Sequence, residues 1–235
     1  MNSLSLQPIG VIRSPYREKF AVPRQPGLVE DGTGELLLLP PYSQPEAVRG
    51  LEQFSHVWVL FIFHQTKDGG WRPTVRPPRL GGNARMGVFA TRSTFRPNPI
   101  GMSLVELKGI RLKGAEVVLE LGSLDLVDGT PVIDIKPYLP FAESLPHARA
   151  GFAQDAPSAN MPVTFSPDAR QTLLREAVKY PHLERFITQV LAQDPRPAYR
   201  QKEQEAREFA VHLLDFNVVW RVENDETCVV AIDKR

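Results

Sequence analysis

The segment ATRSTFRPNPIG, residues 90–101, combines two arginines, two prolines, an asparagine and a glycine. Pro97 and Pro99 fix their own φ angles and bias Arg96 and Asn98 toward extended conformations. Both polar side chains are therefore held in a preset direction, with little left to order when a ligand binds. This pattern is typical of a preorganised binding loop. The alternative is a rigid connection between strands whose arginines are solvated.

A second polar loop, residues 14–27 (SPYREKFAVPRQPG), carries Arg17, Lys19 and Arg24 against a single acidic residue. Its end, Gln25-Pro26-Gly27, has the composition of a tight turn that presents backbone groups to a ligand. The signal is weak by itself, because most loops are polar without having a chemical role.

Residues 121–138 place three polar side chains at alternate positions. Asp134, Lys136 and Tyr138 would all point to one face of an extended segment, and Pro137 stiffens its exit. Together they could hold a polar ligand or tune a proton transfer. A solvated strand edge with an Asp–Lys ion pair explains the same spacing.

The stretch AQDPRPAYR, residues 192–200, ends a helical pattern with a proline-stiffened arginine and a tyrosine. Arg196 and Tyr199 could stack on a nucleotide and pair with it. A helix stop with surface charges is the plainer interpretation. Asp125 and Asp128 also have a plain interpretation as turn formers, because Asp-Gly is a good hairpin turn.

Several other chemistries lack the residues that they require. His56 and His64 would lie ~26 Å apart on an extended strand, too far to share a metal ion. The single Cys228 rules out an intrachain disulfide and a multi-cysteine zinc site. No GxSxG elbow and no GxGxxG between a strand and a helix occur, which disfavours a nucleophilic hydrolase and a Rossmann dinucleotide site. We therefore expect no metal.

The charge of the sequence is local. The net charge is +1, yet six arginines and no acidic residue lie between Gly69 and Val105. The sequence opens without a basic leader and a long apolar run, and no apolar run approaches the ~20 residues that span a bilayer. We expect a cytoplasmic protein without a membrane segment.

Short elements must position these residues. The chain has 22 prolines, which divide it, and its first 140 residues in particular, into short pieces that suit strands and turns. In His56–His64 both alternating sets are largely apolar, which predicts a central strand covered on both faces. Seven strands at this spacing predict a mainly β front region, either a barrel or a sandwich. The expected strands are Leu6–Ile12, Glu35–Leu39, His56–Phe63, Met86–Ala90, Ser103–Leu107, Glu116–Leu121 and Pro131–Ile135.

The composition changes near Ala142, where ESLPHARAGFAQDAPSANM loses apolar periodicity, as a linker would. After it, Ser166 with the following proline predicts the start of a helix, and Pro181 predicts the start of another. The apolar stripes of the two helices are Ala169, Leu173, Leu174, Ala177 and Val178, and Leu183, Phe186, Ile187, Val190 and Leu191.

The end of the sequence is expected to form a hairpin of His212–Val222 and Thr227–Ile232. The chain should therefore contain a β unit at residues 1–141, a linker at 142–160 and a small α+β unit at 161–235.

Five motif blocks together are similar to one family: SPYREKFAVPRQPG, FSHVWVLFIFHQ, PPRLGGNARMGVFATRSTFRPNPIG, GSLDLVDGTPVIDIKPYLPF and DPRPAY. They resemble the TrmO (TsaA-like) proteins, tRNA methyltransferases that act on threonylcarbamoyl-adenosine beside the anticodon, over nearly the whole chain. The resemblance implies an antiparallel β-barrel that binds S-adenosylmethionine, a small C-terminal domain, and a homodimer whose interface helps form the cofactor site.

The resemblance also implies roles for single residues. Cofactor contacts are implied for Gln25, Pro26, Gly27, His64, Gln65, Arg92, Leu104, Ser123, Leu124 and Asp125. The catalytic group would be Asp134, Lys136 and Tyr138, with Arg96 and Asn98 beside the reacting base. Asp194, Arg196 and Tyr199 would reach the modified nucleotide from the tail.

The implied chemistry explains the stiff turn at residues 90–101. Methyl transfer from a sulfonium is an in-line displacement that neutralises charge, so positioning matters more than strong acid–base help. The attacking exocyclic nitrogen must lose a proton, for which Asp134 or a water is the candidate, oriented by Tyr138 or Lys136.

The threonyl part of the substrate brings a carboxylate, which Arg96 or Arg196 could bind through two hydrogen bonds. The other arginines of residues 69–105 would then contact the RNA backbone. One alternative is an RNA-binding module without catalysis, which predicts salt-sensitive tRNA binding that survives mutation of Asp134. Another is an enzyme of a different reaction type whose barrel binds a different nucleotide.

Overall fold

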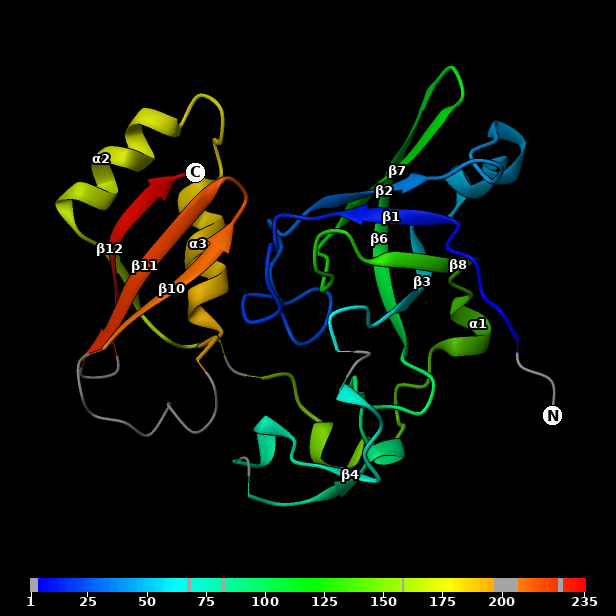
Figure 1. Cartoon of the computed structure of the whole chain (residues 1–235), viewed down its shortest axis with the longest axis horizontal. Coiled ribbons are helices and arrows are strands. Elements are labelled where there is room, and N and C mark those ends of the chain that lie inside the picture. The colour runs from blue at the N-terminus through cyan, green and yellow to red at the C-terminus, as the bar shows by residue number, and fades with distance from the viewer. Residues whose placement is uncertain (1–3, 67–68, 82, 158, 197–206, 224–225) are drawn as a thin grey trace.

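The computed structural model describes residues 4–66, 69–81, 83–157, 159–196, 207–223 and 226–235. Most of its regular structure is strand. A closed barrel of six antiparallel strands lies beside a four-stranded sheet that carries two helices (Figure 1). This confirms the prediction of a mainly β protein with a barrel followed by a small α+β unit, while the boundaries of these units stay a prediction.

The barrel closes in the order β1-β2-β7-β6-β3-β8. Along β3, Val57, Val59 and Phe61 are buried in the interior, and the residues between them lie half-buried on the outer wall. Pairing with β6 and β8 confirms the central place of this strand, but its outer face is covered less than expected. The barrel strands are β1 (Gly10–Arg13), β2 (Gly34–Leu38), β3 (His56–Ile62), β6 (Ile100–Lys113), β7 (Glu116–Gly122) and β8 (Pro131–Pro137).

Strand β6 is much longer than the predicted Ser103–Leu107. Its inward positions are buried as far as Leu107, and beyond them it continues with β7 as a hairpin that projects from the barrel (Figure 1). The register shifts between Leu107 and Gly109, and such a bulge bends a strand. The irregularity explains why the alternating pattern read from the sequence stopped too early.

The segment between β3 and β6 lies outside the barrel. The predicted strand Met86–Ala90 is extended only at Met86–Gly87 (β5), which pairs with Thr74–Val75 (β4). Val88–Ala90 forms a 3-10 turn instead. After β8 comes a short helix, α1 (Pro140–Glu143), which the sequence did not predict.

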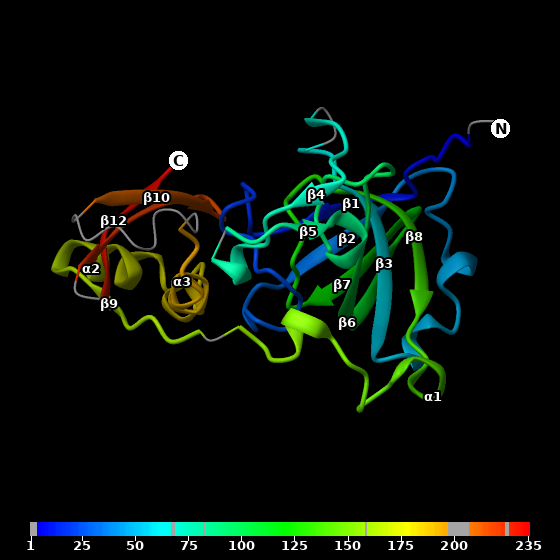
Figure 2. The same ribbon diagram turned by 90° about the horizontal axis from the view of Figure 1, so that it is seen from below.

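The second sheet has the order β10-β11-β12-β9, and both helices lie on one side of it (Figure 2). The prediction of one strand over His212–Val222 is wrong, because the chain reverses direction at Leu214-Asp215, where Leu214 adopts a φ of 54°. No glycine marks this turn, so the sequence pattern hid it. The strands are β9 (Val163–Phe165), β10 (Glu208–Leu213), β11 (Phe216–Glu223) and β12 (Glu226–Lys234).

The first long helix, α2 (Pro167–Glu176), begins as predicted, because the hydroxyl of Ser166 accepts a 3.2 Å hydrogen bond from the N–H of Ala169. Its predicted apolar stripe is wrong in part. Leu174 and Val178 are 78% and 97% exposed. The helix ends at Glu176, and only a narrow face of it is buried.

The second long helix, α3 (Leu183–Ala192), begins two residues after the predicted Pro181. All five residues of its predicted stripe are buried, which confirms that face. In the described part of the chain, no helix combines the length and the apolar character needed to cross a bilayer.

The barrel and the α+β unit share one hydrophobic cluster. The buried ring of Tyr16, from the loop after β1, lies 5.7 Å from the ring of Phe186 on α3. Backbone hydrogen bonds also cross the junction: Arg17 N–H donates to the carbonyl of His212 at 3.3 Å, and Leu214 N–H donates to that of Pro15 at 2.8 Å. The two units are therefore packed against each other.

Candidate active site

Three loops that are distant in the sequence meet beside the barrel. Oε1 of Gln25 accepts a hydrogen bond of 2.6 Å from Nη1 of Arg92. The N–H of Gly27 donates to Oγ of Ser123 over 2.8 Å. We call Gln25-Pro26-Gly27, Arg92 and Ser123-Leu124-Asp125 the loop cluster. Seven of the ten residues predicted to contact the cofactor thus lie in one place.

Ser123 holds the loop cluster together from a left-handed backbone conformation, with a φ of 45°. A non-glycine residue in this region costs on the order of 1 kcal/mol and is kept only where its surroundings compensate. Here the hydroxyl of Ser123 donates to the carbonyl of Val29 over 3.0 Å, and the N–H of Leu124 donates to the carbonyl of Gly32 over 2.7 Å. Such local strain is common at functional sites.

Asp125 is the charged group at the centre of the loop cluster. Burial raises the pKa of its carboxyl to about 6, although a hydrogen bond from Ser103 and the charge of Arg92 both favour the ionised form. Its Oδ1 is buried and has no hydrogen-bond partner among the described residues. A buried acceptor without a partner is costly, and a bound ligand with a donor group would relieve that cost.

The loop cluster fits the amino-acid end of S-adenosylmethionine, the cofactor that the sequence resemblance implies. That end carries both a carboxylate and an ammonium group. Arg92 offers a guanidinium to the first, and Asp125 offers an unpartnered carboxylate oxygen to the second. Opposite charges this close together suit a zwitterion better than a simple anion.

The remaining predicted cofactor residues differ in their placement. The side chain of Leu124 is fully buried, so only its backbone can face a ligand. Leu104 lies on the outer wall opposite Trp58, while its neighbour Ser103 points inward. His64 and Gln65 follow β3 in a turn in which His64 N–H donates to Ile62 over 2.8 Å.

Asp134 and Lys136 share the outer wall of β8, as their alternation predicted. Their side chains form an ion pair of 2.9 Å, and both are well exposed. Tyr138 follows them, with its ring 6.4 Å from that of Trp58. In a single chain this arrangement is a solvated ion pair, as the plainer interpretation has it. It does not lie on a strand edge, however, because β8 is paired on both sides.

The turn that carries Arg96 and Asn98 is rigid, and Arg96 points back into it. Nη1 of Arg96 donates to the carbonyls of Val88 at 3.3 Å and Thr91 at 2.7 Å, and the guanidinium lies 5.7 Å from the ring centroid of Phe89. Asn98 is next to Pro99, whose carbonyl accepts from Phe63 at 2.8 Å. This places Asn98 beyond the end of β3, opposite His64 and about 13 Å along the strand direction from Leu60, the neighbour of Asp134.

A groove of about 1220 Å³ joins the basic loop after β1 to the end of α3. Lys19, Arg24 and Arg79 line it, and so do Asp194 and Arg196 from the tail. Glu226 also lines the groove, so four cationic side chains face two acidic ones, and this net positive lining suits a nucleic-acid backbone. Tyr199, the third predicted tail residue, lies outside the described residues.

Asp194 and Arg196 form a two-point ion pair within the groove. Nε and Nη2 of Arg196 lie 2.7 and 2.9 Å from the two carboxylate oxygens of Asp194, which has a φ of 46°. The Arg196 guanidinium is buried. Arg79 crosses the groove and donates to the carbonyl of Asp155, in the segment before β9.

Sequence reasoning missed Ser103, which reaches the Asp125 carboxylate from the barrel interior. Its signal was a hydroxyl among the inward-facing residues of β6, at a position where an apolar side chain is the rule. No sequence pattern predicted the groove itself, because its lining comes from five separate segments of the chain. Among the described residues, no group of three or more His, Cys, Asp or Glu side chains could hold a metal ion.

Comparison with known proteins gives matches along nearly the whole chain. The family model of the tRNA-methyltransferase O N-terminal domain matches residues 11–144, and that of the TrmO C-terminal domain matches residues 158–235. The tRNA (adenine(37)-N6)-methyltransferase of Escherichia coli (strain K12) is 66% identical over 235 residues, which is 100% of both chains.

Two further relatives come from Pseudomonas aeruginosa. A putative S-adenosylmethionine-dependent methyltransferase, RcsF, is 51% identical over 92% of this chain and 91% of its own. The crystal structure of TrmO from the same species superposes with a TM-score of 0.81 at 41% identity, covering 99% of each chain. The barrel with its α+β unit is thus a fold already seen in a solved structure.

Proposed function

The chain belongs to the tRNA-methyltransferase O family, and from this premise we propose that it transfers a methyl group from S-adenosylmethionine to N6 of adenine 37 in tRNA. The observation that carries this function is the 66% identity to the Escherichia coli enzyme over the full length of both chains. The loop cluster supports it, because its paired charges fit the amino-acid end of the cofactor.

The substrate that we propose is adenosine 37 already modified with a threonylcarbamoyl group. Its carboxylate needs a cation near the base, and Arg196 in the groove is the candidate. Arg196 is bound by Asp194, so a substrate carboxylate would compete with that partner. Lys19, Arg24 and Arg79 remain for the phosphates of the anticodon loop.

The residues of the chain act mainly by positioning. S-adenosylmethionine, when bound, supplies a methyl group on a sulfonium centre. Arg92 and Asp125 would hold its amino-acid end, and the turn at Gln25-Pro26-Gly27, which is bonded to Arg92 and Ser123, would line the same site. Asp134 accepts the proton that the exocyclic nitrogen of the base must lose, and Lys136 orients the carboxylate through their ion pair. Tyr138 orients the base from the same face.

We further propose a cytoplasmic homodimer. Asp134 lies on the outer wall of the barrel, whereas the loop cluster lies at the loops, so a second copy has to bring the two groups together. Exposed apolar side chains lie near that wall: Phe141 in α1, Leu145 just after it, and Met102 on β6. A tRNA substrate and the single Cys228 agree with the cytoplasm.

The proposed function is tested by mass spectrometry of nucleosides from tRNA incubated with the purified protein and S-adenosylmethionine. Two substrates are compared, tRNA with and without the threonylcarbamoyl modification. One added methyl group on the modified adenosine alone supports the reaction and the substrate. Methylation of both tRNAs would remove the requirement for the threonylcarbamoyl group, and tRNA binding without methylation would favour an RNA-binding module.

A further inference from the structure

Helix α3 of the C-terminal unit holds the loop before β2 through an ion pair between Arg185 and Asp31, which we call the clasp. Arg185 donates from Nε and Nη2 to the two carboxylate oxygens of Asp31, and the N–H of Asp31 donates to Oε1 of Gln189 over 3.0 Å. The Asp31 side chain is only 10% exposed. The hydrogen bonds from Arg185 lower the pKa of the Asp31 carboxyl, so the pair is ionised throughout the neutral range.

The same loop starts at Gly27, within the loop cluster, and is hydrogen-bonded to Ser123 and Leu124. Gly27 donates its N–H to Ser123, the carbonyl of Val29 accepts from the Ser123 hydroxyl, and the carbonyl of Gly32 accepts from Leu124. Asp31 lies between these contacts. A displacement of Asp31 would therefore move the backbone that keeps Ser123 in its left-handed conformation.

We propose that Arg185 is a positioning residue for cofactor binding: through Asp31, helix α3 fixes the loop of residues 27–33 against the loop cluster. The inference rests on the proposed function, and it assigns to the C-terminal unit a role in cofactor affinity besides RNA contact. When the clasp is broken, the loop of residues 27–33 adopts its binding-competent conformation in a smaller fraction of the molecules. The apparent Kd for S-adenosylmethionine then rises in inverse proportion to that fraction.

The junction does not depend on this ion pair alone. Tyr16 packs on Phe186, and backbone hydrogen bonds join the segment after β1 to the end of β10. A cavity of about 640 Å³ lies beside the clasp and is lined by Gly27, Asp31, Ser123 and Arg185, so altered side chains have room. Variants of Arg185 should therefore fold with the two units still in contact.

The test uses full-length Arg185→Asp, Arg185→Lys and the double variant Asp31→Arg/Arg185→Asp. Binding of S-adenosylmethionine is measured by calorimetry without tRNA, and kcat and KM are measured with tRNA. Arg185→Asp should raise Kd and KM for the cofactor about tenfold and leave kcat at saturating cofactor unchanged. Arg185→Lys should fall between this variant and the wild type, and the double variant should recover most of the lost affinity.

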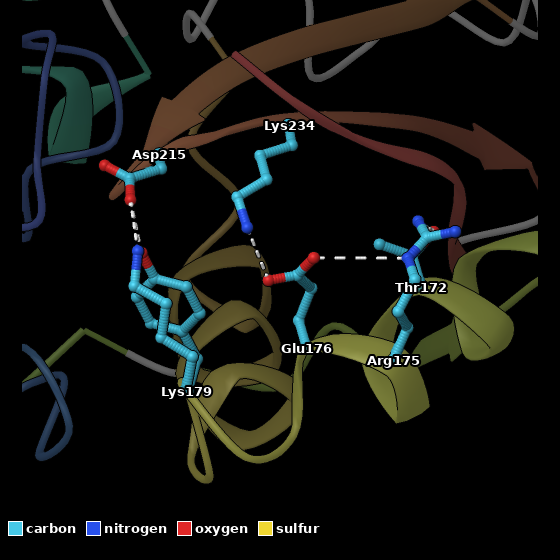
Figure 3. A network of polar contacts seen from close by, with 7 residues as sticks. Thr172, Arg175, Glu176, Lys179, Asp215 and Lys234 are labelled. Carbon is cyan, nitrogen blue, oxygen red and sulfur yellow. Dashed lines mark hydrogen bonds and ion pairs between the residues drawn. The ribbon is translucent and has the colours of Figure 1, made fainter.

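A matched control is the ion pair of Glu176 and Lys234, which joins α2 to β12 within the C-terminal unit (Figure 3). The carboxylate of Glu176 is 12% exposed, close to that of Asp31, and lies 2.8 Å from Nζ of Lys234. Lys234→Ala removes an ion pair of similar burial that does not touch residues 27–33. It should lower the melting temperature without changing cofactor affinity.

The outcomes separate the inference from the proposed function. An unchanged cofactor Kd in Arg185→Asp overturns the positioning role, and so does an equal rise in Lys234→Ala, which would mean a general loss of stability. A wild-type protein that binds no S-adenosylmethionine and methylates no tRNA overturns the proposed function itself. If the wild type is active and Arg185→Asp binds the cofactor with the same affinity, only the inference about the clasp is overturned.

Discussion

Gln25 and Arg92, 67 residues apart in the sequence, are joined by a hydrogen bond of 2.6 Å between Oε1 and Nη1. Gln25 in turn donates from Nε2 to the carbonyl of Arg24 over 2.5 Å. The guanidinium of Arg92 is thus oriented before any ligand arrives. A group held in this way loses little side-chain entropy on binding.

Replacing Arg92 by lysine should weaken cofactor binding about tenfold, because an ammonium group cannot reproduce a planar fork that bonds Gln25 and a carboxylate at once. Calorimetry with S-adenosylmethionine measures the change. Arg85→Lys is the control, since Arg85 is exposed on the same segment. Equal affinities for Arg92→Lys and the wild type would remove Arg92 from the cofactor site.

Asp125→Asn should stabilise the protein at neutral pH while weakening cofactor binding. The folded pKa of about 6 lies above the ordinary value of 3.8, so the folded state binds more protons than the unfolded state between these values. Stability of the wild type therefore falls as pH rises from about 4 to 6, by on the order of 3 kcal/mol. Urea unfolding at pH 4 and pH 7.5 should show a gain for the variant only at the higher pH. The same gain at both pH values would contradict a buried charge as its cause.

Asp134→Asn should lower kcat by about a hundredfold with little change in KM for tRNA, because it removes a proton acceptor and leaves the RNA contacts intact. Steady-state methylation of modified tRNA measures both constants. Glu120→Gln is the matched control, since Glu120 forms an exposed ion pair of the same length, 2.9 Å, with Arg111 on the barrel strands β7 and β6. A wild-type kcat in Asp134→Asn would leave water as the proton acceptor.

Arg79→Ala should weaken tRNA binding and lower the slope of log K against log salt by about one, as expected for one lost phosphate contact. Binding is measured at several salt concentrations without cofactor. Arg49→Ala serves as a control, because Arg49 is highly exposed and pairs only at 3.9 Å with Glu46. Parallel salt slopes for Arg79→Ala and the wild type would place Arg79 outside the RNA contacts.

Much of the fold could be predicted because local rules governed it. Alternating apolar residues located the barrel strands, and Ser166 with its proline marked the start of α2. The errors arose where tertiary structure overrode the local pattern. The turn at Leu214-Asp215 contains no glycine, and Leu174 with Val178 fitted a helical stripe although the sheet covers a different face.

The site was predicted as segments rather than as contacts. The motif blocks indicated that residues 25–27, Arg92 and residues 123–125 belong together, but spacing contains no information on which atoms meet. The pair of Asp31 and Arg185 spans 154 residues and has no sequence signal at all. Likewise, burial of Asp125 depends on the packing of Ser103 inside the barrel, which composition does not show.

The strand order of the small sheet has a consequence for biosynthesis. β12, the last of its four strands to leave the ribosome, lies between β11 and β9, so β9 has no sheet partner until residues 226–234 have been made. The barrel shows the same feature, because β1 pairs with β8. Neither sheet is complete until its last strand has been made. Until then the nascent chain exposes unpaired, apolar edges of the earlier strands. Substitutions in β12 should therefore reduce the yield of folded protein in cells more than they reduce the activity of the molecules that do fold.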